Sequence, residues 1–530
     1  MQTIKPLHIL FIVISLFFIS CTDSESDTNS ENCLLEYEDL CYYQNNMDID
    51  SYKLDRLTDD EFNKLSKENR YIVANKILTT LFYGYPKNIL EEKIESGDFI
   101  SSLVRDLNSY KNNIYAVEEY IRDKNYFYQD SLKEVNRILS RFFAMEKLDR
   151  YFFNNWISYI LTQTIMFTPA YELETTHSPN ITTVYSRIVK LLEESATMQF
   201  ITYEHMTSSE NWRRFRSPED NGREMLEIFT LDFNDSDVPI AGKALQNWKL
   251  DRDNDTLVID LNENRDPLTL FSTTIYNGYD FYLELVKSSE FTYGATSRLV
   301  DFFFLDMDGV KKDKITQKII GSNPATWQDI LLQIILSKEY LLNSTREKSA
   351  EELYYSLLRK MSYKHKKSSF NTLRYYLEDM HQASLKYKLG KLDRVPLDTL
   401  SFANYHKFIR EHVVMRRLNP EKKDNYDDWD SYGWRDEFIN RDFFDLDEEN
   451  HEKTLESFLN YIFTVMIYRL PQKRELEFFK SHMLQTKDGK LQFLNRFNPF
   501  VDNSRDRNIT ILVLDYISRL EELYRFKGVN

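Results

Sequence analysis

The residues best placed to do chemistry lie in the string Arg223-Glu224-Met225-Leu226-Glu227. Arg223 and Glu227 are four residues apart, so on a helix they share a face, with Glu224 only partly beside them. We expect a buried Arg–Glu pair that fixes helix packing. The alternatives are catalytic carboxylates and a contact with a partner or ligand. Because glutamates three residues apart are common on helices, the evidence for acid–base catalysis is weak, and no catalytic residue is assigned.

Three aspartates at alternate positions, Asp251, Asp253 and Asp255, match the first ligands of a calcium-binding loop. The rest of that pattern is missing, because Thr256 stands where the loop requires glycine and Asn262 where it requires glutamate. Apolar and β-branched residues flank the aspartates on both sides. We therefore expect a β-hairpin with a solvated turn.

Other motifs for metal binding or nucleophilic catalysis are absent from the sequence. The nine histidines include no His-Glu-x-x-His, and His406 and His412 are six residues apart, on different faces of a helix. There is no Gly-x-Ser-x-Gly elbow, phosphate-binding glycine loop or dinucleotide fingerprint. We predict no metal site and no cofactor, and we favour a protein that is not an enzyme.

Cys21 ends an amino-terminal export signal. Lys5 supplies positive charge, residues 7–19 are mostly apolar, and Ser20 is a small residue directly before the cysteine. This ending resembles the lipobox of bacterial lipoproteins, which implies that residues 1–20 are a signal peptide and that Cys21 is the lipid attachment site, carrying acyl chains such as palmitate. Each buried CH₂ contributes about 0.8 kcal/mol, so a multiply acylated cysteine is a stable anchor. The alternative is an ordinary signal peptide.

Residues 21–56 are expected to be a flexible acidic tether, because the stretch after Cys21 is polar and has little to bury. Such a stretch resembles the signal by which some Gram-negative bacteria send lipoproteins to the outer face of the outer membrane. Cys33 and Cys41 lie eight residues apart in the tether. In an exported protein they can form a local disulfide; the alternative is a pair of free thiols.

The composition indicates a mainly α-helical protein. Glycine and proline number only 12 each in 530 residues, so few positions force turns. The net charge of −16 disfavours nucleic acid, because little in the chain would neutralise phosphates. The aromatic content of 15% reflects either aromatic helix packing or an adhesive surface.

The hydrophobic pattern predicts an irregular multi-helix architecture. Residues 57–345 should form a helical core with a small inserted hairpin near 248–261, and residues 346–530 a C-terminal helical region packed on that core. A capped helix with a single buried apolar stripe is expected at 326–335. An irregular segment or surface loop is expected at 421–447.

Two segments, 77–86 and 462–471, look alike. In each, an apolar helix ends just before a proline, and a helix rich in Glu and Lys follows. They are either duplicated helix–turn–helix units or helix ends that recur by chance. Two copies are too few to identify a repeat array.

The string from Arg223 to Leu231 resembles the signature Ala-Arg-Glu-Leu-Met-Glu-Leu-Phe-Thr-Leu-Gly of the bacterial family called domain of unknown function 1800. Asp237-Val238, Ala244-Leu245 and Trp248 are similar to a stretch that follows in that family. The likeness runs from about residue 71 to 342. It implies a mostly helical exported protein of a family whose biochemical activity is not established.

The departures from the family pattern concern its histidines. Glu146-Lys147-Leu148 resembles a Glu-Lys-Met motif, but the following Phe-Trp-His-Asn-His-Phe appears as Phe152-Phe153-Asn154-Asn155-Trp156. A later His-Asp of the family appears as Arg265-Asp266. Histidines at such positions would suit metal binding or acid–base chemistry. If the family has a metal-dependent activity, we expect this chain to lack it.

We therefore predict a lipid-anchored protein of the cell outer membrane, exposed at the cell surface. Its expected role is that of a non-catalytic binding or accessory subunit of a cell-envelope assembly, with other envelope or outer-membrane proteins as partners. One alternative is a surface lipoprotein that captures glycans or nutrients. Another is a metal-dependent envelope enzyme.

Overall fold

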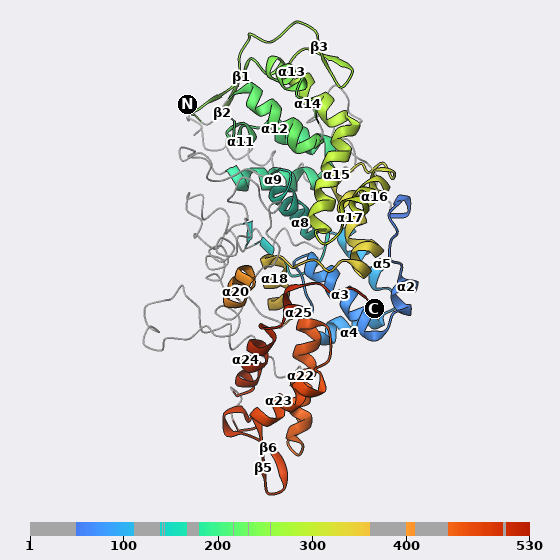
Figure 1. Ribbon diagram of the computed structural model, residues 1–530, viewed down its shortest axis with the longest axis vertical. Coiled ribbons are helices and arrows are strands. Elements are labelled where there is room, and N and C mark those ends of the chain that lie inside the picture. Colours follow the sequence, from blue (N-terminus) through green and yellow to red (C-terminus); the bar gives the residue numbers. More distant parts are fainter. Residues whose placement is uncertain are drawn as a thin grey trace, which may run out of the picture.

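The chain folds into helices joined by short loops and hairpins (Figure 1). The computed structural model describes residues 49–110, 138–166, 180–360, 399–408 and 444–529, apart from positions 140, 143, 216, 232, 255 and 502–504 within them. The fold is mainly helical with small two-stranded antiparallel sheets, so the predicted fold class is confirmed. The signal peptide and most of the tether, with Cys21, Cys33 and Cys41, lie outside the described residues.

The first helices form the blue layer of Figure 1: η3 (Ile49–Ser51), α2 (Asp59–Lys64), α3 (Lys67–Thr80), α4 (Lys87–Glu95) and α5 (Phe99–Asn108). Helix α2 begins where the sequence predicts, because Thr58 and Glu61 form a capping box. The preceding residues, expected in the tether, pack on the core: Leu54 is buried and the Tyr52 hydroxyl donates to Asp329 over 3.2 Å. The folded body therefore extends beyond the predicted boundary.

The next helices lie above this layer in Figure 1: α8 (Arg150–Gln163), α9 (Asn180–Glu193), α10 (Met198–Met206), α11 (Ser209–Trp212), α12 (Pro218–Thr230) and α13 (Asp237–Ala244). The predicted hairpin follows, with β1 (Trp248–Asp251) antiparallel to β2 (Thr256–Ile259). A second hairpin, β3 (Leu268–Leu270) with β4 (Thr273–Ile275), was not predicted. Both lie at one end of the elongated molecule (Figure 1).

The chain then returns through α14 (Gly278–Lys287), α15 (Ser289–Phe303), α16 (Gly309–Ile320), α17 (Trp327–Leu336) and the π-helix η4 (Glu339–Asn343). Helix α17 has the predicted capping box between Thr326 and Asp329. The prediction of a single buried stripe is wrong, because all residues of α17 are buried, including Gln328 and Gln333. The helix lies inside the protein rather than at its surface.

The remaining elements are α18 (Ala350–Lys360), α20 (Thr399–Phe408), α22 (His451–Ile467), α23 (Lys473–Met483), β5 (Leu484–Lys487), β6 (Lys490–Phe493), η9 (Asn495–Phe497), α24 (Asp506–Ile517) and α25 (Glu521–Tyr524). The α22–α24 helices and the β5–β6 hairpin form the end opposite β1–β4 (Figure 1). Most of the predicted irregular segment 421–447 lies outside the described residues. Phe444, near its end, stacks on Phe458 of α22 with ring centroids 3.7 Å apart.

The two similar segments both form helix–turn–helix units, α3–α4 and α22–α23. In each, a residue in the left-handed region closes the first helix: Phe82 has φ of 56° and Tyr468 has φ of 63°. The ring of Phe82 packs against Phe142, Tyr159 and Tyr355, with centroids 5.2–5.7 Å apart. Aromatic side chains thus form part of the core between helices distant in the sequence.

Candidate functional site

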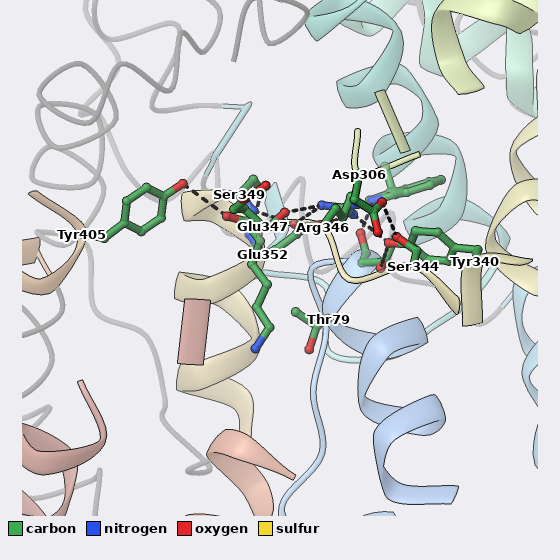
Figure 2. Close-up of polar contacts among 12 residues, drawn as sticks. Thr79, Asp306, Tyr340, Ser344, Arg346, Glu347, Ser349, Glu352 and Tyr405 are labelled. Atoms are coloured by element: carbon green, nitrogen blue, oxygen red, sulfur yellow. Dashed lines mark hydrogen bonds and ion pairs between the residues drawn. The ribbon is translucent and has the colours of Figure 1, made fainter. Parts of the chain in front are cut away.

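The loop before α18 carries a buried ion pair at the centre of a polar network (Figure 2). The Arg346 guanidinium donates to both carboxylate oxygens of Glu352, over 2.6 and 3.0 Å, and to the Tyr340 hydroxyl over 2.7 Å. Glu352 also accepts the backbone N–H of Ser349. Burial lowers the pKa of Arg346, but Glu352 outweighs that effect and holds the pKa above its usual value.

Two further groups extend the network on either side, as Figure 2 shows. Asp306 accepts from the Ser344 hydroxyl over 3.0 Å and from the Thr345 backbone over 2.6 Å. On the other side, the Tyr405 hydroxyl of α20 donates to the Lys348 carbonyl over 3.2 Å. The network therefore connects α20, α18 and the turn before α16.

Lys76 and Lys348 are buried near the ion pair and Lys360 is buried at the far end of α18, and each donates to groups from a distant segment. Lys76 donates to the carbonyls of Tyr340, Leu341 and Ser344 over 2.7–3.2 Å. These carbonyls lie in and just after η4, where a helix leaves carbonyl groups without partners. Burial lowers the pKa of Lys76 to about 7.

Lys348 and Lys360 likewise donate hydrogen bonds to residues at the ends of other helices. Lys348 donates to the Leu523 carbonyl over 2.8 Å, and burial lowers its pKa to about 7. Lys360 donates to the hydroxyls of Tyr468 and Thr79, over 3.0 and 3.4 Å. Burial lowers its pKa well below the usual range. These residues join segments far apart in the chain, so their role is structural.

A cleft of about 460 Å³ opens beside the far end of α18. Its lining comes from the turn between α3 and α4, from α4 and α5, from the turn before α8, and from α18. The residues are Tyr83, Gly84, Tyr85, Pro86, Ile89, Lys93, Asp106, Glu146, Lys147, Leu148 and Arg359. A cleft of this size falls within the range of roughly 300–1,000 Å³ typical of small-molecule sites.

The turn between α3 and α4, which lines the cleft, is fixed by hydrogen bonds and by close packing against α18. The Trp156 indole donates to the Thr80 carbonyl over 2.8 Å, and the Tyr83 hydroxyl donates to the Glu146 carbonyl over 2.7 Å. Gly84 lies so close to α18 that a methyl group there would come within 2.7 Å of the Ser356 carbonyl oxygen. Only glycine fits this close approach of the turn to α18.

Arg359 is the most unusual charge in the cleft. Its Nη2 donates to the carbonyls of Phe142 and Met145, and its guanidinium carbon lies 4.4 Å from the ring centroid of Tyr83. Among the described residues, no carboxylate lies within ion-pair distance of it. Burial lowers the pKa of Arg359, although the side chain remains partly exposed, and burial raises the pKa of Tyr83.

The predicted buried pair of Arg223 and Glu227 is wrong. Both side chains are exposed on α12, and Glu224 is partly buried. Arg223 forms an exposed ion pair with Asp235, with an Nη1–Oδ1 distance of 3.8 Å. The Glu227 backbone carbonyl accepts a hydrogen bond from the Arg298 guanidinium over 3.0 Å. The apolar residues of the same string face the core instead, so α12 needs no buried charge pair to pack.

The positions where the resembling family has histidines are occupied by structural side chains. Asn154 is buried between Glu193 and Gln328, to which it is hydrogen-bonded. Trp156, at the second histidine position, is buried and donates its indole N–H to the Thr80 carbonyl over 2.8 Å. Arg265, at the third, is exposed, and its neighbour Asp266 pairs with Lys243 over 3.0 Å.

The calcium-like aspartates form a hairpin turn. The Asp251 carboxylate accepts the backbone N–H groups of Asp253 and Asn254, over 3.0 and 3.3 Å, and the Asn254 side chain over 2.7 Å. Across the described ranges, no three histidine, cysteine or carboxylate side chains gather as metal ligands. Asp306 and Asp308 lie in the turn between α15 and α16, and Asp308 caps α16.

Sequence reasoning did not single out the cleft. Two of its walls come from strings already noted: the turn at 83–86, in one of the two similar segments, and Glu146-Lys147-Leu148, in the family likeness. These two strings line one cleft together with α18, which lies more than 200 residues further along the chain. No signal in the sequence pointed to Arg359.

Comparison with models of known protein families, with curated proteins and with solved structures returns no match. Within the part of the chain that the structure describes, no helix has both the length and the apolar composition to cross a membrane.

A group of exposed apolar side chains lies at the β1–β4 end of the molecule. It consists of Ile259, Leu261, Tyr276 and Tyr279, and we call it the hairpin patch. Buried Trp248 lies beside two of its members, because Trp248 pairs with Ile259 across the hairpin and its ring centroid lies 4.9 Å from that of Tyr279. Leu261 is 99% exposed.

Proposed function

We propose that the protein is a non-catalytic binding or accessory subunit of a cell-envelope assembly, anchored by acyl chains on Cys21 and exposed at the outer membrane surface. The observation that carries the binding role is the hairpin patch. Apolar side chains gathered at one end of a soluble fold mark a surface for protein contact. In this proposal the chain is a lipoprotein akin to the domain of unknown function 1800 family.

The proposed partner is another envelope protein with an apolar surface edged by basic residues. Acidic side chains outnumber basic ones around the hairpin, where Asp251, Asp253, Asp260, Glu263 and Asp266 accompany Lys249, Arg252 and Arg265, and Lys249 pairs with Asp260. An acidic rim favours a basic partner surface, since complementary charge speeds association and fixes orientation. The aromatic rings of Tyr276 and Tyr279 suit the centre of such an interface.

The rest of the described structure supports a binding role rather than catalysis. The buried ion pair and the lysines around it are occupied by contacts with carbonyls, hydroxyls and Glu352. The Asp251 carboxylate of the hairpin accepts the backbone N–H groups of Asp253 and Asn254. The charged groups described thus serve to position segments of the chain.

The docking proposal is tested with the full-length protein, extracted from native membranes in mild detergent. A photo-crosslinking residue at position 261 should capture one envelope protein reproducibly. Leu261→Glu should abolish co-purification of that protein, because the carboxylate would be buried against apolar surface. Val310→Glu is the matched control: Val310 is 67% exposed on α16, away from the hairpins in Figure 1.

Two results would contradict the docking proposal. One is that Val310→Glu and Leu261→Glu reduce co-purification equally. The other is that light scattering shows the protein alone or self-associated through the patch. The anchor is tested separately: Cys21→Ala should leave the protein unacylated and released from membranes, and unchanged membrane association would reject the anchor.

A further inference from the structure

We propose that the cleft beside α18 binds a small ligand with an oxyanion group, a carboxylate or a phosphate, through Arg359 and Lys93. This site is separate from the hairpin patch, so neither proposal depends on the other. The cleft lies among the α3–α5 helices, whereas the patch lies at the β1–β4 end (Figure 1).

The first argument is the charge of Arg359. A guanidinium is always protonated, and partly burying it without a carboxylate is unfavourable. Two backbone carbonyls accept from its Nη2, but they do not neutralise it. Within the described ranges, its buried Nε has no hydrogen-bond partner, and the side chain lines the cleft. A planar oxyanion at this wall would supply the missing charge.

The second argument is the position of Lys93 in the same cleft. Its ammonium lies 5.1 Å from the ring centroid of Tyr85, and no carboxylate of the described chain is within ion-pair distance. Two nearby lysines, Lys67 of α3 and Lys87 of α4, both pair with Glu91 of α4. Lys93 therefore differs from its neighbours in facing an aromatic ring and the cleft instead of an acid.

The third argument concerns the remaining polar groups. The Tyr83 hydroxyl already donates its proton to the Glu146 carbonyl, so its oxygen can only accept from a ligand. Burial raises the pKa of Tyr85, so that hydroxyl stays protonated. Asp106 and Glu146 also line the cleft, and a carboxylate accepts hydrogen bonds. An oxyanion alone would meet these two carboxylates unfavourably. The ligand should therefore carry a hydroxyl or amine as well, as a sugar acid does.

The experiment measures binding to the full-length protein in detergent by calorimetry, with three probes: glucuronate, inorganic phosphate and neutral glucose. Glucuronate should bind and phosphate should compete with it, whereas glucose should not bind. Raising the salt concentration should weaken binding. Arg359→Gln should weaken glucuronate binding by roughly tenfold or more, since a charge-assisted hydrogen bond contributes about 1.5–3 kcal/mol.

Lys93→Gln is the second variant, because loss of Arg359 also frees two carbonyls and can disturb folding. It should weaken binding by severalfold without changing the unfolding temperature. Lys87→Gln, on the same helix but outside the cleft, is the matched control and should bind as the native protein does. The proposal is overturned if neither anion binds, if glucose binds as tightly as glucuronate, or if Lys93→Gln and Lys87→Gln bind equally.

Discussion

Arg346 and Glu352 form a two-point ion pair that is wholly inside the protein, with Nη1–Oε2 and Nη2–Oε1 distances of 3.0 and 2.6 Å. The pair lies where the loop after η4 enters α18. Glu352 also caps that helix by accepting the Ser349 N–H. Because Phe526 donates its backbone N–H to the Arg346 carbonyl over 3.0 Å, the same loop holds the C-terminal segment.

Glu352→Gln should destabilise the protein strongly. The substitution leaves the Arg346 guanidinium buried without a counter-charge, and breaking a buried pair in this way costs about 3–5 kcal/mol. Chemical denaturation of the variant measures the change in the free energy of unfolding. The control is Glu194→Gln, which removes a surface pair with Lys190 at 3.7 Å and should change stability by at most about 1 kcal/mol. If both variants changed the free energy of unfolding equally, the claim that Glu352→Gln leaves a buried Arg346 without a counter-charge would be contradicted.

The buried lysines should make stability depend on pH in the neutral to alkaline range. Burial lowers the pKa of Lys76 and Lys348 to about 7, whereas an unfolded lysine titrates near 10.4. Between these values the unfolded chain binds more protons. The free energy of unfolding therefore rises with pH by up to about 1.4 kcal/mol per unit per lysine. The stabilisation is fully present above the unfolded pKa and is lost as the pH falls to about 7.

Denaturation curves at pH 7, 8 and 9 measure this slope, and these values lie below the range in which tyrosines ionise. Lys76→Met should reduce the slope, since the variant has no ammonium at that position. Lys67→Met changes a largely exposed lysine and should leave the slope as it is. A slope that is the same in both variants would show that Lys76 stays protonated over this range.

The contact between α12 and α15 should tolerate no side chain at Gly294. A methyl group there would lie within 2.8 Å of the Thr230 Cα and would also meet the Phe229 carbonyl. Since both are backbone atoms, Gly294→Ala must separate the helices and should cost about 1–3 kcal/mol. Gly309→Ala is the control, because nothing lies within 4 Å of the new methyl group. We expect it to be neutral or slightly stabilising by thermal denaturation.

The hairpins show which parts of the fold the sequence could reveal. The β1–β2 pair was predicted because β-branched residues flank a polar turn. The β5–β6 pair was not, although Asp488-Gly489 is a strong turn signal, and both residues have positive φ in the structure. Only three residues form each of β3 and β4, and strands that short carry too little alternation to be recognised.

The charged residues show why the site was harder to find. In α18, Glu351, Glu352, Arg359 and Lys360 read as the solvated face of a surface helix. Three of the four are buried. Glu352 pairs with Arg346, six residues earlier, but the partners of Glu351 and Lys360 come from segments 108 to 281 residues distant: Tyr159, Tyr468 and Thr79. Local periodicity carries no information on such partners. A backbone carbonyl at a helix end that accepts a hydrogen bond from a distant lysine has no recognisable sequence pattern.

The Asp251 turn should bind no calcium, despite its spacing of aspartates. Its carboxylate oxygens already accept two backbone N–H groups and the Asn254 side chain, and calcium needs six to eight oxygen ligands. Adding calcium or a chelator should therefore leave the unfolding temperature unchanged. Asp251→Ala should instead lower it slightly at any calcium concentration, because the turn loses its internal acceptor. A calcium-dependent rise in unfolding temperature that Asp251→Ala removes would show that the turn rearranges to hold the ion.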